Sequence, residues 1–319
     1  MDVVVFCYNR PDKLKMCLEA INLDYTDKLW IFCDGAKNEA HAAGVKMNLE
    51  IAEKFAHENK KVIFRPHNFG TPKNVISGLD EVFSETDSCF ILEDDCIVKP
   101  EAYAYVDWAL KTFRDETDIF SVNTMSPLNG LLNRIAARFI KNDVVACTRV
   151  FAFWGWATWA DRWYEFRKAL EPFNNPFGKG SNIPFSYGSH VKYTIQQFEA
   201  GKVGGWDARL MVLTMNKSKL YLHPKKSLMR NIGLDGTGLH FRSRQSVIKD
   251  VNELSFSGFV PKLNKEKIDI KKNQLIKILL IINDMAIMFR SKILAFLPLE
   301  IRARLKKIIF GNKTKYSQF

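Results

Sequence analysis

An apolar run ends abruptly in three consecutive carboxylates at Phe90-Ile91-Leu92-Glu93-Asp94-Asp95. Three carboxylates at the end of a buried strand repel one another, and burial raises the cost of keeping them charged. A divalent cation is the usual way to offset that cost, and Mg²⁺ or Mn²⁺ combines such ligands with water and diphosphate oxygens. A solvated acidic turn is the alternative, because acidic triplets are common, but the position of this one in the chain favours a cation site.

The 92 residues that precede the triplet alternate between two hydrophobic patterns. Short apolar runs rich in β-branched residues predict strands, and apolar residues at helical spacing predict helices between them. We expect strands at residues 3–7, 29–33, 61–64 and 89–92, and helices from Pro11, at 42–58 and at 72–83. This order predicts an α/β fold with a parallel, doubly wound sheet. Ligands of such sheets bind beyond the carboxyl ends of the strands, where the polar residues Asn9, Arg10 and Asp34 and the triplet are found.

Residues 101–245 are less regular and richer in aromatic residues and glycine. The stretch 151–163 contains four tryptophans within ten residues. Because aromatic faces stack on sugars, we expect Gly155 and Trp156 to line the acceptor side of a cleft. Packing in the core is the alternative for part of this cluster, since large aromatic side chains are mostly buried.

The net charge of +12 is concentrated at the end of the chain. Residues 261–319 contain 14 Lys and Arg but only 4 Asp and Glu, so the first 260 residues carry a net charge of only +2. Within 271–319, basic residues surround broad apolar helix faces, a pattern typical of helices in an anionic membrane interface. The alternatives are a helix pair packed on the protein's own core and a dimer contact. We expect a membrane surface, and no nucleic acid, as a partner.

Composition and cysteine usage exclude several other classes of protein. Hydrophobic residues make up 47% and charged residues 26%, which is ordinary for a globular protein and excludes wholesale disorder or a small disulfide scaffold. The sequence contains no run of 18 apolar residues, so it predicts no simple membrane span. The six cysteines form no C-x-x-C pair, so we expect reduced, buried thiols. With no signal peptide before the first strand, the sequence predicts a cytoplasmic protein bound peripherally to the inner face of the cell membrane.

The sequence divides into four parts. We expect two halves of one domain at 1–105 and 106–245, and the resemblance described next implies that the first half binds a nucleotide sugar and the second an acceptor. A polar connector at 246–270 and a basic amphipathic tail at 271–319 complete the chain.

Four segments within residues 1–245 resemble the GT-A fold glycosyltransferases, which transfer sugars from nucleotide diphosphates and carry an acidic motif. These are FCYNRP at 6–11, FCDG at 32–35, EDD at 93–95, and GWD at 205–207 with the stretch 224–240. The chain is similar to bacterial polysaccharide sugar transferases and, more distantly, to N-acetylglucosaminyltransferase I. The resemblance implies a Rossmann-like, mostly parallel sheet with flanking helices, to which the sequence adds a helical C-terminal tail.

The same resemblance implies roles for particular residues on the donor side. Arg10 would contact the nucleotide and Asp34 the uracil ring. Asp95 would be the direct metal ligand, while Glu93 and Asp94 would hold ribose, water and the loop. The glycine-rich stretch 231–240 would close over the donor diphosphate.

Three further residues have both a chemical and a plainer interpretation. Asp207, between Trp206 and an aliphatic run, is the candidate base for the acceptor hydroxyl, and the alternative is a helix N-cap. His240 could ligate the metal or hydrogen-bond the diphosphate, whereas a lone histidine is usually a surface or packed residue. Lys73 could contact phosphate, and a solvated or capping role suits it equally.

The sequence therefore predicts a hexosyl- or N-acetylhexosaminyltransferase that uses Mn²⁺ or Mg²⁺. Its donor would be a UDP-sugar, and its acceptor a glycan or a lipid-linked glycan of surface polysaccharide assembly. We expect inversion of configuration, with Asp207 as base. The rival interpretations are a sugar-phosphate nucleotidyltransferase and a non-catalytic carbohydrate- or membrane-binding module on a transferase fold.

Overall fold

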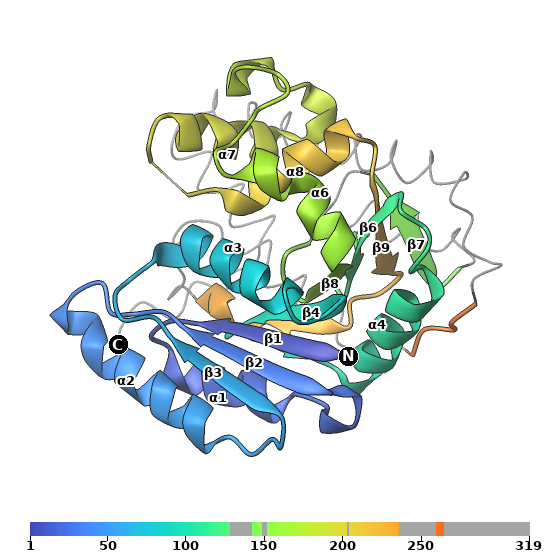
Figure 1. Cartoon of the computed structure of the whole chain (residues 1–319). Helices are drawn as coiled ribbons and strands as arrows, with labels where there is room; N and C mark the ends of the chain where they lie inside the picture. Colours follow the sequence, from blue (N-terminus) through green and yellow to red (C-terminus); the bar gives the residue numbers. More distant parts are fainter. Residues whose placement is uncertain (128–141, 149–151, 203, 236–259, 265–319) are drawn as a thin grey trace, which may run out of the picture.

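The computed structural model describes residues 1–127, 142–148, 152–202, 204–235 and 260–264 (Figure 1). The predicted tail and most of the predicted connector lie outside these ranges, and so does His240. Within the described residues, none of the helices is both long enough and apolar enough to cross a bilayer.

A mixed, mostly parallel sheet of eight strands forms the centre of the molecule, with the order β3-β2-β1-β4-β8-β6-β9-β7. Its strands are β1 (Asp2–Cys7), β2 (Lys28–Cys33), β3 (Lys60–Phe64), β4 (Ser88–Glu93), β6 (Ile119–Asn123), β7 (Val144–Cys147), β8 (Trp156–Trp159) and β9 (Leu220–Pro224). The four strands expected from the sequence, β1 to β4, pair in parallel as neighbours. The predicted α/β fold is thus confirmed.

Helices cover both faces of this sheet. They are α1 (Pro11–Glu19), α2 (Glu39–Lys54), α3 (Gly70–Phe83), α4 (Pro100–Thr112), α6 (Ala160–Leu170), α7 (Ser189–Glu199) and α8 (Trp206–Asn216), with 3₁₀ turns at Leu23–Tyr25, Gly180–Asn182, Phe185–Tyr187 and Ile232–Asp235. Figure 1 shows α2 and α3 on opposite faces of β1 to β3. Such double cover explains why β1 and β2 read as continuous apolar runs rather than as an alternating pattern.

Alternate residues of β1 belong to two separate hydrophobic cores. Val3 and Val5 pack with residues of α1 and α4 on one face of the sheet. Val4 and Phe6 pack with residues of α3, α6 and α8 on the other. The side-chain period of two along a strand therefore divides the interior into two layers.

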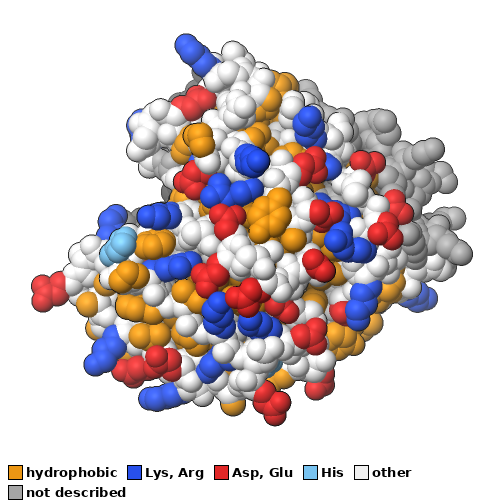
Figure 2. Space-filling model, in the orientation of Figure 1, with side chains coloured by type: hydrophobic (Ala, Val, Ile, Leu, Met, Phe, Trp, Pro, Cys, Tyr) orange, Lys and Arg blue, Asp and Glu red, His pale blue; other side chains and the backbone are white. Residues whose placement is uncertain are grey.

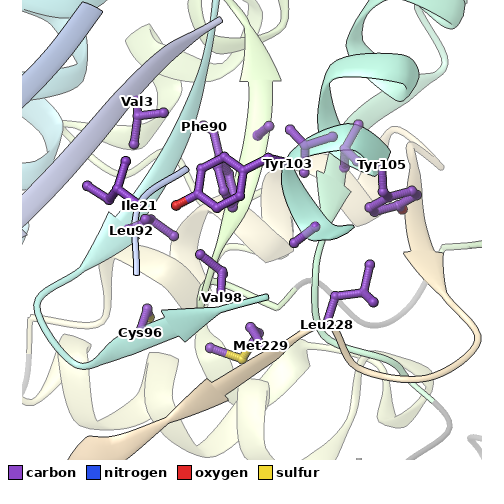
Figure 3. Close-up of a cluster of buried hydrophobic side chains, with 14 of the residues drawn as sticks. Val3, Ile21, Phe90, Leu92, Cys96, Val98, Tyr103, Tyr105, Leu228 and Met229 are labelled. Carbon is purple, nitrogen blue, oxygen red and sulfur yellow. The ribbon is translucent and has the colours of Figure 1, made fainter. Parts of the chain in front are cut away.

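A second, two-stranded sheet lies beside the first core. It pairs β5 (Cys96–Val98) with β10 (Met229–Asn231) in antiparallel register. Figure 3 shows Cys96, Val98 and Met229 near Leu92, with the Tyr103 ring close to Phe90. The two rings meet edge to face, with centroids 5.5 Å apart. This packing lies beside the end of β4 and the short turn between β4 and β5, which together carry the acidic triplet.

The six cysteines are all free and buried, as predicted. Surface charges are mixed: Figure 2 shows Lys and Arg side chains interspersed with Asp and Glu over one face, without a single basic patch.

Candidate functional site

The acidic triplet lies at the carboxyl end of β4, next to the end of β1. Glu93 is the last residue of β4, and the Asp94 backbone N–H donates a hydrogen bond to the carbonyl of Phe6, 3.0 Å away. The two aspartates are buried, with 2% and 6% of their surface exposed, and Glu93 is half-buried. The alternative of a solvated acidic turn is therefore wrong.

One guanidinium faces the three carboxylates. Arg10, which immediately precedes α1, forms ion pairs with both Asp94 and Asp95, the latter at 2.8 Å. The Glu93 carboxylate makes no hydrogen bond or ion pair with any side chain in the described part of the protein. The site thus contains two more carboxylates than guanidinium groups, and this imbalance has measurable consequences for proton binding.

The pKa values of two of these carboxyl groups are raised. Burial raises the pKa of Glu93 to about 8, the neighbouring Asp95 and Asp94 add to the effect, Arg10 opposes it, and Asp207 contributes a smaller increase. Burial also raises the pKa of Asp94 to about 6, against the opposing charge of Arg10. In the absence of another cation, the site therefore holds a proton at neutral pH.

This chemistry fits a hard divalent cation. Mg²⁺ and Mn²⁺ prefer carboxylate oxygens, and a second positive charge would balance the excess that raises the pKa of Glu93. Across the described ranges, no three His, Cys, Asp or Glu residues are spaced to enclose a metal by themselves. A cation at Asp95 would therefore need water or diphosphate oxygens as further ligands, the usual arrangement for Mg²⁺. The role of His240 stays a prediction.

Raising the pH is expected to destabilise the protein in EDTA. The folded-state pKa of Glu93, about 8, lies above its ordinary value of 4.5, so the folded state keeps a proton that the unfolded state has lost. The free energy of unfolding should therefore fall as pH rises from about 4.5 to 8 and level off above that range. Thermal unfolding at fixed ionic strength measures this slope. Glu93→Gln should flatten it, and an unchanged slope in that variant would contradict the assignment.

Asp207 lies in the first turn of α8, where its carboxylate is half-buried. The N-cap of this helix is Gly205, whose φ of +47° lies in the left-handed region, so the alternative that Asp207 is the cap is wrong. Within the described chain, its carboxylate has no hydrogen bond or ion pair. Its charge nevertheless reaches Glu93, because it contributes to the raised pKa of that residue.

Two contacts fix the start of α8. The ring of Trp206 is buried and meets Phe153 at an angle of 72°, with centroids 5.1 Å apart. A Cβ on Gly204 would lie 2.3 Å from Cγ of Pro72, so the loop before α8 passes directly over the start of α3. The chain thereby brings Asp207 to the same end of the sheet as the acidic triplet.

Asp34 follows β2 and is buried, but protein groups occupy its carboxylate. The two oxygens accept hydrogen bonds from the backbone N–H groups of Gly35, Phe69 and Gly70 and from the side chain of Asn68, at 2.8–3.0 Å. In this structure, Asp34 organises the loop that leads into α3. Its predicted contact with uracil stays a prediction.

Two polar residues near the start of α3, Lys73 and Asn74, differ in exposure. Lys73 is exposed, and its ammonium lies 4.4 Å from the centroid of the Phe69 ring. Its predicted donor contact stays a prediction. Asn74 is buried, and its Oδ1 accepts a hydrogen bond from Nε of Arg65 at 3.2 Å.

The predicted acceptor residues Trp156 and Gly155 need correction. Only 1% of Trp156 is exposed, because its ring packs between Phe120 and Trp206 in the core. Gly155 is also buried, and a Cβ there would lie 2.5 Å from Oγ1 of Thr124. Neither residue offers a surface to a sugar. The core-packing alternative holds for these two.

Sequence reasoning missed the way in which β10 meets the acidic turn. Asn231, the last residue of β10, donates a hydrogen bond to Oδ1 of Asp95. Lys13 of α1 donates to the carbonyl of Ile232. The only signal in the sequence was the resemblance of 231–240 to a closing loop, which said nothing about its contact with Asp95.

Comparisons with known proteins give one family and several distant structures. The sequence profile of Glycosyl transferase family 2 matches residues 2–194. A search of the curated proteins finds no significant match.

Three solved structures are similar to the chain at low identity. The first is a mannosyltransferase from Pyrobaculum calidifontis in complex with GDP-Man and Mn²⁺, with 12% identity and a TM-score of 0.34 over 68% of this chain and 73% of that one. The second is a 4-diphosphocytidyl-2C-methyl-D-erythritol synthase from Anaerococcus prevotii, with 8% identity and a TM-score of 0.37 over 79% of this chain and 96% of that one. The third is mouse xyloside xylosyltransferase 1, with 12% identity and a TM-score of 0.33 over 69% of this chain and 83% of that one.

Proposed function

The chain belongs to glycosyl transferase family 2, and we propose that it transfers a sugar from a UDP-sugar to a glycan or lipid-linked glycan with the help of Mn²⁺ or Mg²⁺. Membership of the family makes it a glycosyltransferase with a GT-A fold. The donor, the metal and the mechanism are our proposals. The observation that supports them most is the carboxylate triplet with its two buried aspartates, which carries an excess of negative charge next to Arg10.

The residues at the end of β4 would form the donor side of the site. Asp95 would hold the cation, which when bound supplies a Lewis acid for the charge that develops on the leaving diphosphate. Glu93 and Asp94 would hold ribose, water and the loop. Arg10 is fixed by its ion pairs with the two aspartates, so its positive charge would lie beside the same diphosphate. This preorganisation lowers the cost of charge development, because the groups need not reorient during the reaction.

Asp207 would act on the acceptor side as the general base. The acceptor oxygen attacks the anomeric carbon and forms the new glycosidic bond, while the bond from that carbon to the diphosphate oxygen breaks. The electron pair of the broken bond remains on the diphosphate, and the acceptor's proton moves to the Asp207 carboxylate. A single displacement of this kind inverts the configuration at the anomeric carbon. The absence of a protein donor to Asp207 among the described residues suits a base.

A panel of nucleotide sugars tests the proposal. With Mn²⁺, we expect slow hydrolysis of one UDP-sugar, and its abolition by EDTA. A product that forms only when a nucleoside triphosphate is supplied would instead favour the nucleotidyltransferase. Nucleotide binding without turnover would favour the non-catalytic module. Once an acceptor is identified, a product that keeps the α configuration of the donor sugar would rule out inversion. The panel also decides between hexosyl and N-acetylhexosaminyl transfer.

We further propose that the enzyme works in surface polysaccharide assembly at the inner face of the cell membrane. Support comes from the sequence of 271–319, which lies outside the described residues. Cosedimentation with anionic liposomes tests this part separately. Deletion of 271–319 should abolish binding to the liposomes, and binding that survives the deletion would refute the role of the tail.

A further inference from the structure

The end of β10 is bound to the acidic turn by side-chain and backbone contacts. Nδ2 of Asn231 donates a hydrogen bond to Oδ1 of Asp95 at 3.0 Å. The next backbone N–H, that of Ile232, donates to the carbonyl of Asp95 at 2.8 Å. Because β10 pairs with β5, Asn231 lies opposite Cys96, the residue that follows Asp95. The strand pairing thus fixes the distance between the two side chains.

Both oxygens of the Asp95 carboxylate are held, one on each side. Oδ1 accepts from Asn231, and Oδ2 pairs with Arg10 at 2.8 Å. The amide of Asn231 is itself fixed, because its Oδ1 accepts a hydrogen bond from the backbone N–H of Gly233 at 2.8 Å. Only 3% of Asn231 is exposed, so water has little access to this bridge.

Two more residues hold the segment against the site. Nζ of Lys13, a buried residue of α1, donates to the carbonyl of Ile232 at 2.8 Å. A Cβ on Gly233 would lie 2.1 Å from Oδ2 of Asp95. The φ angle of Gly233 is not in the left-handed region, so backbone conformation does not explain why a glycine occurs here. Its lack of a side chain is therefore needed for the close approach to Asp95.

We propose that Asn231 is a positioning residue that fixes the Asp95 carboxylate in the orientation that receives the divalent cation. The inference rests on the proposed function, since it takes Asp95 as the metal ligand. A short carboxylate that can rotate about its side-chain bonds presents its oxygens in many directions, and a fixed amide limits them. Loss of such an outer hydrogen-bond partner weakens metal affinity by about 10- to 100-fold.

Binding of Mn²⁺ alone, measured by calorimetry on the full chain, tests this role without any need for turnover. Asn231→Leu keeps a side chain of similar size but removes the amide, and we expect its Kd for Mn²⁺ to rise about 10- to 100-fold. Asn123→Leu is the matched control. Asn123 is a buried amide that bonds to Ser121 and to the carbonyl of Leu222, and it has no bond to the acidic turn. We expect this control to lose stability and to keep the wild-type Kd.

The possible outcomes separate the two proposals. Equal Kd values in wild type and Asn231→Leu would overturn the positioning role while leaving the proposed function intact. A wild type that binds no Mn²⁺ would overturn both. If Asn231→Leu does not fold, Asn231→Ala decides, because it removes the same amide donor to Oδ1 of Asp95. It should weaken Mn²⁺ binding by a similar factor, and an unchanged Kd in that variant would overturn the inference.

Discussion

Replacing Asp207 with asparagine is expected to lower kcat by about 100- to 10,000-fold, the range that general acid–base groups contribute. Asparagine has the same shape but cannot accept the acceptor's proton, so the bound donor should lack an activated nucleophile. Donor binding should survive, because Asp207 lies on α8 and not in the β4–β5 turn. Initial rates at saturating donor and acceptor, together with the KM for the donor, measure the two effects separately.

Asp12→Asn is the matched control for this prediction. Asp12 occupies the position of α1 that Asp207 occupies in α8, the second residue of the helix, and it is exposed. Both substitutions remove a carboxylate that stabilises a helix N-terminus by about 0.3–1 kcal/mol. Only Asp207→Asn should lower kcat. A wild-type kcat in that variant would remove Asp207 from the mechanism without affecting the assignment to the family.

Asp95→Asn is expected to abolish the binding of Mn²⁺ that the wild type shows. Because Asp95 is a proposed ligand, the loss of affinity should exceed the about 10- to 100-fold effect of an outer hydrogen-bond partner. In EDTA, the variant should be about as stable as the wild type. Arg10 keeps Asp94 as its partner, and the pKa of Glu93 loses one of the neighbouring charges that raise it. Calorimetry with Mn²⁺ and thermal unfolding in EDTA measure the two quantities.

Asp161→Asn provides the control for Asp95→Asn. Asp161 also pairs with arginine side chains, Arg114 at 3.2 Å and Arg162 at 2.6 Å, but it is exposed on α6. Its substitution should leave Mn²⁺ binding unchanged. If Asp95→Asn binds Mn²⁺ as tightly as this control does, the metal site lies elsewhere.

The fold of the first 100 residues could be predicted because three of its four predicted strands, β1, β2 and β4, are buried on both faces. Such strands have almost no polar residues, so the ends of β2 and β4 are marked sharply by Asp34 and by Glu93. The predicted strand bounds agree with the structure to within one residue, and the helix predicted at 42–58 runs from Glu39 to Lys54. The antiparallel insertion of β8 between β4 and β6 could not be predicted, since it depends on pairing between distant segments.

The proximity of Arg10 to the acidic triplet could be predicted from the strand topology alone. Both lie at carboxyl ends of neighbouring parallel strands, and such ends share one edge of the sheet. The local sequence did not reveal whether a given aromatic side chain is buried or exposed. Trp156 has the composition of a sugar platform, but tertiary packing encloses its ring. The contact between Asn231 and Asp95 spans 136 residues, so no local pattern encodes it.

Thermal unfolding with UDP, in the presence of Mn²⁺ or of EDTA, tests the central claim most directly. A ligand that binds only the folded state raises the unfolding midpoint by mass action. If the carboxylates at the end of β4 hold a cation that binds the donor diphosphate, UDP should raise the midpoint with Mn²⁺ and have almost no effect with EDTA. An equal rise under both conditions, or no rise under either, would contradict the account.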